Sequence, residues 1–433
     1  MRCTHHRGYL LVALLALCAA PHRLAAQAAP AASNPSAVGQ AAPDAGASAA
    51  DQAAADRARS ERAAELFNQG KRLEALPLLE QLVKVHPGEA QTMVALAACL
   101  VEHAATVPDP DVAGRERLRA RDLLHRARDL GNTNTLAMNL SELLDGLPAG
   151  GTIRFSDDAA VEAAMRAGEA AFSRRNFAIA IRSYSRALEL DPRNYTAALF
   201  IANTYDKEGE LRRGAEWYER AIRLDPNVET AYRYYADMLA REGKMANART
   251  LLIHAAVAEP YSRIVWRELR AWATLNGTRL NEVFIAVPVL QNSQPGSVPE
   301  PPQMSAVWRA YRRVSESWHN GNEFKSRFPE EKSYRHSLPE EAEALAAAAK
   351  QLKSAAGDPN SGQALLDQPN AGLLLRLYDA GLIEPYVLFS LGDRGIARDY
   401  VGYRAQHRDK LEQYLDRFVV PPCPPRRAAS PGA

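Results

Sequence analysis

Three short stretches decide the fold because they repeat one pattern: ALELDP at residues 187–192, AIRLDP at 221–226 and AAVAEP at 255–260. Their final prolines stand 34 residues apart, and each proline follows an acidic residue. Proline ends a helix because it has no N–H to donate, and it also disfavours the helical conformation of the residue before it. Residues 161–262 are therefore predicted to contain three copies of one helical unit.

Small and large residues also recur at matching positions of the three copies. The second helix of each copy has two small residues with a large one between them: Ala180, Tyr184 and Ala187; Gly214, Tyr218 and Ala221; Ala248, Leu252 and Ala255. The first helix has a small residue and, three positions later, a second contact residue: Gly168 and Ala171; Ala202 and Tyr205; Ala236 and Leu239. Small residues let two helix axes approach, and large ones fill the space beside them. Each copy is thus predicted to be a pair of antiparallel helices.

This 34-residue pattern resembles the tetratricopeptide repeat (TPR) family. One hairpin cannot bury its own apolar face, so neighbouring hairpins must stack. The resemblance implies a right-handed solenoid with a concave groove that binds an extended peptide or a partner helix. We therefore predict an all-α fold, with a TPR-type solenoid of about five units plus a capping helix, followed by a small C-terminal helical domain.

A degenerate form of the pattern precedes the regular copies, ending one helix at Pro87 and inserting a loop at residues 106–114. Pro77 departs from the pattern and is expected to lie in the first turn of its helix, where proline is tolerated. The segment at 283–290 fits either a helix or a packed extended segment. The predicted boundaries are a signal peptide at 1–28, an Ala/Pro-rich disordered spacer at 29–56, the degenerate TPR-like block at 57–147, three regular units with a capping helix at 157–290, a Pro-rich linker at 291–304, the C-terminal helical domain at 305–420 and a disordered tail at 421–433.

The N-terminus has the three-part layout of a secretory signal peptide. Arg2 and Arg7 precede an apolar run at residues 9–20, and Ala26 to Ala28 form an A-x-A cleavage site. The run is too short to span a membrane. We expect an exported protein, periplasmic or secreted, in the envelope of a Gram-negative bacterium. Leu17 before Cys18 disfavours a lipid anchor, which needs a small residue there.

Charge and cysteine content exclude several classes of function. Removal of residues 1–28 takes away three arginines and no acid, which changes the formal net charge from +2 to −1. A near-neutral chain lacks the electrostatic footprint of a nucleic-acid or anionic-membrane binder. Only Cys99 and Cys423 remain after the signal peptide, so no disulfide framework is expected.

No catalytic, metal or cofactor motif is present, and none of these sites is predicted. One cluster in the C-terminal domain leaves an alternative open, comprising Trp308, Tyr311, Arg312, Arg313, Trp318, His319, Glu323, Arg327, His336 and His407. A hydrolase could use His319 or His336 with Glu323. The aromatic spacing is also that of a core-facing helix, and we favour this simpler interpretation.

The TPR resemblance implies that first-helix side chains line the concave groove. It points to nine residues: Met165, Glu169, Phe172, Leu199, Asn203, Asp206, Arg233, Asp237 and Arg241. The basic residues and asparagines that grip a C-terminal carboxylate in some TPR domains are replaced here by Met165, Glu169, Phe200, Thr230 and Tyr234, which disfavours that ligand. We predict a non-catalytic scaffold that binds another protein. The alternatives are an enzyme or enzyme subunit, an envelope assembly factor, and a groove filled by the N-terminal block or linker of the chain itself.

Overall fold

The computed structural model describes residues 45–147 apart from 108 and 133, residues 154–287, and residues 302–424 apart from 321, 359–361 and 369. Every regular element in these residues is helical, as predicted. The chain divides into two compact bodies, which we call the N-terminal body (residues 1–238) and the C-terminal body (239–433). The signal peptide and most of the spacer, linker and tail predicted above lie outside the described residues.

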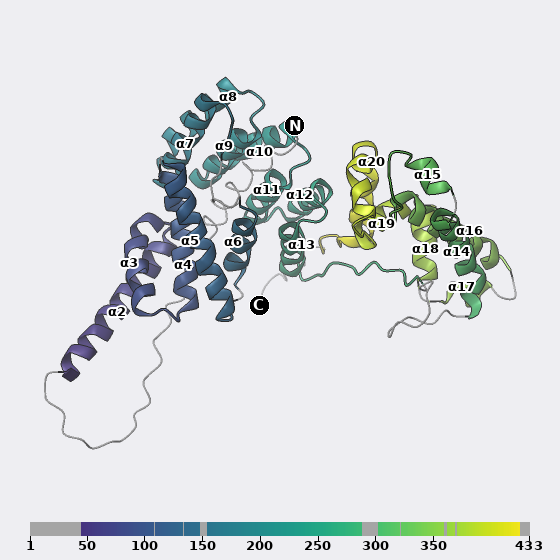
Figure 1. The fold of residues 1–433 in the computed structure, drawn as a ribbon, viewed down its shortest axis with the longest axis horizontal. Coiled ribbons are helices and arrows are strands. Elements are labelled where there is room, and N and C mark those ends of the chain that lie inside the picture. Colours follow the sequence, from purple (N-terminus) through teal and green to yellow (C-terminus); the bar gives the residue numbers. More distant parts are fainter. Residues whose placement is uncertain are drawn as a thin grey trace, which may run out of the picture. The chain divides into compact units, whose positions relative to one another are not determined.

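The N-terminal body consists of consecutive helices (Figure 1). They are α2 (Ala45–Asn68), α3 (Arg72–Val85), α4 (Ala90–Thr106), α5 (Pro110–Asp129), α6 (Thr135–Asp145), α7 (Ala159–Ser173), α8 (Phe177–Leu190), α9 (Tyr195–Glu208), α10 (Leu211–Leu224) and most of α11 (Glu229–Arg241). Hairpin partners pack on each other as the repeat pattern requires: α2 with α3, α4 with α5, α7 with α8, and α9 with α10.

The acidic residue before each repeat proline closes the second helix of its repeat. The backbone N–H of Asp191 donates to Ala187, and that of Asp225 donates to Ala221. The two carboxylates then accept from the backbone N–H groups of residues 193 and 227, at 3.1 and 2.9 Å. An aspartate that bonds the backbone two residues later forms a local turn. The Asp-Pro pair therefore both stops the helix and shapes the link to the next repeat.

The turn inside each regular repeat uses a left-handed residue. Gly209 and Gly243 have φ values of 81° and 74°, and Arg175 occupies the equivalent place in the first repeat with φ 59°. Glycine adopts this conformation without a steric cost, whereas an arginine does not. The Arg175 guanidinium stacks on Phe177 and lies 3.5 Å from the carbonyl of Gln69 in the preceding block. The unfavourable backbone conformation of Arg175 is thus found together with a contact between Arg175 and Gln69, which is distant in sequence.

Pro77 lies in the second turn of its helix, so the expectation that it would lie in the first turn was wrong. Helix α3 begins at Arg72, which places Pro77 at its sixth position. The carbonyl of Leu73 consequently has no backbone N–H to accept from at that point. Pro77 is exposed, and water can reach this side of the helix.

Helix α4 is the centre of the N-terminal block. Every residue from Thr92 to Glu102 is buried. Helices α3, α5 and α7 all pack against it. The first helix of the first regular repeat, α7, therefore packs directly against α4.

The C-terminal body contains the last repeat helix and all later elements. Its helices are α12 (Met245–Ala258), α13 (Arg263–Leu275), α14 (Ser305–Asn320), α15 (Glu323–Arg327), α16 (Leu338–Ala356), α17 (Gly362–Leu366), α18 (Ala371–Asp379), α19 (Ile383–Ser390) and α20 (Tyr400–Tyr414), with 3-10 turns at Pro302–Met304 and Ile396–Asp399 and a π-helical turn at Leu415–Val419. Residues 278–287 are extended, and the buried N–H of Ile285 donates to the Tyr386 hydroxyl at 2.9 Å. Of the two possibilities for this segment, its described part is the packed extended one.

Helix α20 closes the C-terminal end of α12. The Tyr400 hydroxyl donates to the carbonyl of Val257 at 2.7 Å, and Arg404 donates to the carbonyl of Ala258. From within α12, Arg249 donates to the carbonyls of Val420 and Pro421 at 2.5 and 2.8 Å. The last carbonyls of a helix have no partner within it. Side chains from the far end of the sequence supply those partners here.

Candidate binding groove

The nine predicted groove residues fall into two groups by exposure. Four are buried: Met165, Glu169, Leu199 and Arg233. Five reach solvent partly or fully: Phe172, Asn203, Asp206, Asp237 and Arg241. Arg241 belongs to the C-terminal body and the other eight to the N-terminal body. Their role in binding stays a prediction.

A tyrosine of the second helix holds a groove residue of the first helix in two successive repeats. Tyr184 donates to Oε1 of Glu169 at 2.5 Å, and Tyr218 donates to Oδ1 of Asn203 at 2.7 Å. Both pairs are separated by 15 residues, so the two bonds occupy the same place in the repeat. The large residue between the two small ones therefore orients a groove side chain as well as filling space.

Glu169 is a carboxyl group in a buried setting. Burial raises its pKa to about 8, because the charged form loses water, while the bond from Tyr184 and the positive charge of Arg117 lower the pKa by smaller amounts. Arg117 comes from α5 and is itself buried. Burial and the nearby Arg166 lower its pKa to about 10, against the attraction of Glu169. The degenerate block at residues 57–147 thus contributes the buried Arg117 to a polar cluster around Glu169.

Arg233 is buried for a different reason. Its Nε donates to Oε2 of Glu229 at 2.7 Å, one helical turn earlier in α11. Its guanidinium also lies over the ring of Tyr234, 4.6 Å from the ring centre. Truncation of either member of this buried ion pair would leave an unpaired buried charge, which is strongly destabilising.

The short segment before α7 lies on the next repeat. The ring of Phe155 meets that of Phe200 edge-on, with 5.8 Å between the ring centres. Phe200 in turn meets Tyr184 at 5.1 Å. Phe200 stands at one of the places compared above with a carboxylate clamp, whereas Phe155 and Arg117 were not predicted. These two residues lie outside the 34-residue period, and their local sequence gives no signal of a distant contact.

The N-terminal body consists of helical hairpins that stack in register. It is therefore a helical repeat protein. The sequence model of a family described as "Tetratricopeptide repeat" matches residues 165–229 and 201–262. This part of the chain consists of tetratricopeptide repeats. Among curated proteins, none matches the sequence.

Similar solved structures include two whose titles name MamA and one whose title names YrrB. "Crystal structure of MamA" is 18% identical, covers 46% of this chain and 94% of that chain, and has a TM-score of 0.24. "MamA 41-end from Desulfovibrio magneticus RS-1" is 14% identical, with 49% and 96% coverage and a TM-score of 0.21. "Crystal structure of YrrB: a TPR protein with an unusual peptide-binding site" is 14% identical, with 48% and 87% coverage and a TM-score of 0.24. These scores are too low to relate the folds, and the match to the family identifies the repeats.

The histidine considered for an enzymatic role, His336, is held between two carboxylates. Its Nδ1 lies 3.0 Å from Oδ2 of Asp393, and its Nε2 lies 3.1 Å from Oε2 of Glu341. Burial alone would lower the pKa of His336, but the bonds to Glu341 and Asp393 outweigh it and raise the pKa to about 9. Tyr311 donates to the same Glu341 oxygen at 2.7 Å. His336 therefore links the start of α16 to the loop after α19.

Other members of that cluster share partners: Trp318 and Arg327 both donate to Glu343, at 3.0 and 2.8 Å. His319 meets the ring of Tyr334 at 4.6 Å, and His407 meets that of Tyr403 at 4.8 Å. Glu323 is the first residue of α15. Trp308, Tyr311 and Trp318 are buried, as expected for a core-facing helix.

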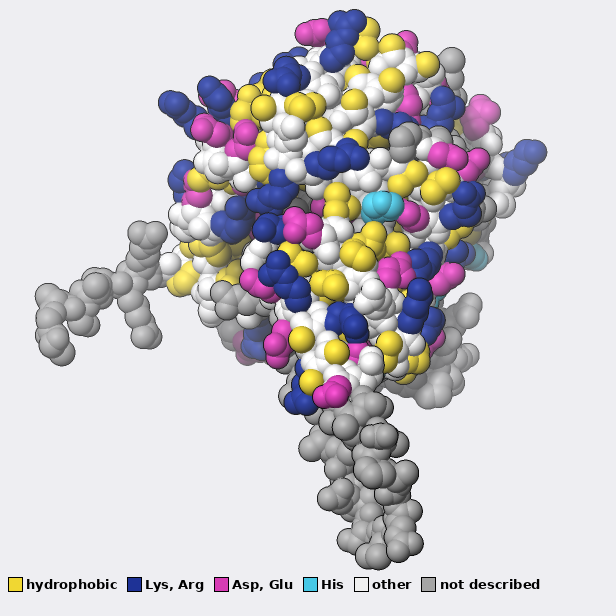
Figure 2. Space-filling view, turned by 90° about the vertical axis from the view of Figure 1, so that its left-hand side faces the viewer, with side chains coloured by type: hydrophobic (Ala, Val, Ile, Leu, Met, Phe, Trp, Pro, Cys, Tyr) yellow, Lys and Arg dark blue, Asp and Glu magenta, His cyan; other side chains and the backbone are white. Residues whose placement is uncertain are grey.

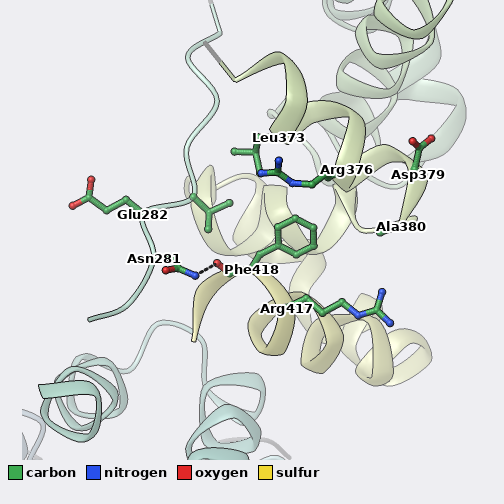
Figure 3. A pocket seen from close by; sticks show the side chains of 9 residues that line it. Asn281, Glu282, Leu373, Arg376, Asp379, Ala380, Arg417 and Phe418 are labelled. Carbon is green, nitrogen blue, oxygen red and sulfur yellow. Dashed lines mark hydrogen bonds between the residues drawn. The ribbon is translucent and has the colours of Figure 1, made fainter. Parts of the chain in front are cut away.

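A cleft of about 700 Å³ lies in the C-terminal body (Figure 3). The extended segment, α18 and the π-helical turn line it, and Asn281 Nδ2 donates to the carbonyl of Phe418 at 3.0 Å. Arg376 and Arg417 extend in opposite directions in Figure 3, so they do not converge on one ligand atom. Five of its nine lining residues are polar or charged, and the other four are Val283, Leu373, Ala380 and Phe418.

The residues that the structure describes hold neither a candidate metal-binding cluster nor a helix that could span a membrane. There, no three His, Cys, Asp or Glu side chains gather to hold a metal ion. None of the described helices is both long and apolar enough to cross a membrane. Figure 2 shows basic and acidic side chains interspersed over the face in view, in keeping with the near-neutral net charge.

Proposed function

We propose that the protein is an exported, non-catalytic scaffold that binds an extended segment of another protein along the first helices of its repeats. This proposal rests on the in-register tetratricopeptide repeats. On their successive first helices, Asn203, Asp206 and Asp237 are at least partly accessible to solvent. Tyr218 fixes Asn203 in one orientation, which lowers the entropy lost when a ligand binds. Repeats generally use such a surface for protein binding.

Site-specific photo-cross-linking tests the groove assignment. A photoreactive amino acid at position 206 or 237 is expected to capture one and the same protein in native cells. The matched control is position 182, an exposed site on the second helix α8. Capture from all three positions alike, or from 182 alone, would show that the first-helix surface is not the binding face.

Export is proposed from the N-terminal sequence. Cleavage after Ala28 would give a mature chain that begins at Ala29, and the intact mass of the native protein measures this directly. A chain that retains residues 1–28 would contradict export by this route. Retention on salt-washed membranes would favour the envelope-assembly alternative over a freely diffusing binder.

The absence of catalysis is proposed from the partners of the candidate groups. His336 is occupied by Asp393 and Glu341, and His319 and His407 contact tyrosine rings. Such contacts serve packing and orientation. The enzyme alternative would instead require a cavity in which a nucleophile or base faces a substrate.

A further inference from the structure

The segment at residues 154–158 makes two kinds of contact with the repeats. Its aromatic side chain, Phe155, packs against Phe200, which is only 3% exposed. Its backbone is held by one carboxylate, because the N–H groups of Phe155 and Ser156 both donate to Oε2 of Glu162, at 2.6 and 3.0 Å. The other oxygen of Glu162 lies 2.6 Å from Nη2 of Arg166. An aromatic anchor and a backbone clamp are the contacts with which a groove holds an extended peptide.

The surface under this segment is formed by first helices. Glu162 and Arg166 belong to α7, and Phe200 belongs to α9. Met165 and Leu199, both predicted groove residues on these helices, are fully buried. Phe155 and Ser156 thus occupy a place on α7 and α9 at this end of the predicted groove, while Asp206 and Asp237 further along remain accessible.

We propose that residues 154–156 are an internal ligand of the groove, and that the partner is an extended segment with an aromatic side chain that displaces them and takes over the same contacts. This proposal rests on the proposed function and specifies the partner's chemistry. The aromatic ring of the partner replaces Phe155 on Phe200, and two consecutive backbone N–H groups replace those held by Glu162.

The internal segment is suited to exchange. Phe155 and Ser156 lie outside the helices, and their backbone N–H groups both bind Glu162, so their release leaves Asp158 in place as the N-cap of α7. The tether of this segment gives it an effective concentration on the order of millimolar. A partner that also contacts the accessible surface near Asp206 can therefore compete successfully.

The test uses the full mature chain and a peptide of its own residues 154–158, acetylated and amidated, with 4-fluorophenylalanine at the Phe155 position. The receptor is a variant with Arg154→Gly, Phe155→Gly and Ser156→Gly, which removes the internal ligand. Fluorine NMR is expected to show line broadening with this variant and at least about tenfold weaker binding to the wild type, because the tethered segment competes. An unlabelled peptide with alanine for phenylalanine should not displace the probe.

Two further variants show where the peptide binds. Phe200→Ala, added to the triple-glycine variant, should abolish the broadening, and Glu162→Ala should weaken it while leaving the apolar contact intact. Circular dichroism verifies that each variant is folded. Binding to neither receptor, equal binding to both, or binding that survives both extra substitutions would overturn the proposal. None of these results would alter a positive cross-link at positions 206 and 237, so failure here is separable from failure of the proposed function.

Discussion

The hydroxyl of Tyr184 donates a 2.5 Å hydrogen bond to Glu169, 15 residues earlier in the chain. Tyr218 and Asn203 repeat this relationship in the next hairpin, where the acceptor is neutral and half-buried. In the third copy the corresponding residues are Leu252 and Asp237, and leucine cannot donate. A tyrosine hydroxyl therefore orients the groove residue in the first two repeats, and the third repeat cannot form this hydrogen bond.

The matched pair Tyr184→Phe and Tyr218→Phe measures what these bonds contribute. Tyr184→Phe leaves a buried carboxyl oxygen without its donor and should cost about 1–3 kcal/mol of unfolding free energy. Tyr218→Phe should cost less, about 0.5–1.5 kcal/mol, because water can reach Asn203. Urea unfolding at pH 7 measures both. Equal losses would mean that burial of the acceptor does not set the cost.

Glu169 makes stability depend on pH. Its folded-state pKa of about 8 exceeds the ordinary value of 4.5, so the folded chain holds a proton that the unfolded chain has lost between these pH values. Stability should therefore fall as pH rises from 4.5 to 8, with a slope of at most about 1.4 kcal/mol per pH unit from this group. Glu169→Gln, which cannot ionise, should remove that component from unfolding curves measured across this range. An unchanged slope would show that Glu169 is ionised in the folded protein.

Two small-residue positions should respond in opposite ways to an added methyl group. A Cβ at position 168 would collide with the ring of Tyr184, whereas at position 214 the nearest atom, the Met238 sulfur, would lie 3.4 Å away. Gly168→Ala should destabilise by about 1–3 kcal/mol through overpacking. Gly214→Ala should be neutral or stabilising by up to about 1 kcal/mol, since alanine is the better helix former. Thermal unfolding of the two variants decides this, and a stable Gly168→Ala protein would mean that α7 and α8 can separate.

His336 should stabilise the C-terminal body only while it is protonated. Its pKa is raised from 6.5 to about 9, so its contribution is complete below pH 6.5 and disappears as pH rises through 9. His336→Gln should unfold at a lower temperature than the wild type at pH 6.5 and at the same temperature at pH 10. Asp393→Asn, which removes one of the two carboxylates, should show a smaller effect in the same direction. A pH-independent difference would indicate a packing role instead.

The cap on α12 can be tested by removing one hydroxyl. Tyr400→Phe keeps the ring but leaves the buried carbonyl of Val257 without its donor, which should cost about 1–3 kcal/mol. Tyr403→Phe is the control, because its hydroxyl donates to Glu384 within the C-terminal helices, at 3.1 Å. Hydrogen exchange in residues 252–258 should rise only in the Tyr400 variant. A rise in both variants would show that the effect is global.

The sequence was sufficient for the repeats because their determinants are local. The 34-residue spacing, the Asp-Pro stops and the small residues act within one hairpin or between neighbours, so Ala180, Tyr184 and Ala187 are buried as expected. The burial of Met165 and Glu169 could not be predicted. Helix α7 packs on α4, and the charge of Arg117 on α5 acts on Glu169, but neither relationship follows the 34-residue period. Tyr400 and Val257 likewise meet across 143 residues, and neither residue type signals that contact.

The link between α12 and the end of the chain constrains the order in which the protein can be completed. Arg249 contacts residues 416–421, so it has no such partner until almost the whole chain has been made. The earlier hairpins find their partners nearby in sequence, and they can close as they emerge. During synthesis, the side of α12 that carries Arg249 would therefore be the last repeat surface to be protected. A chain that stops short of residue 421 would leave it exposed to proteases and to self-association.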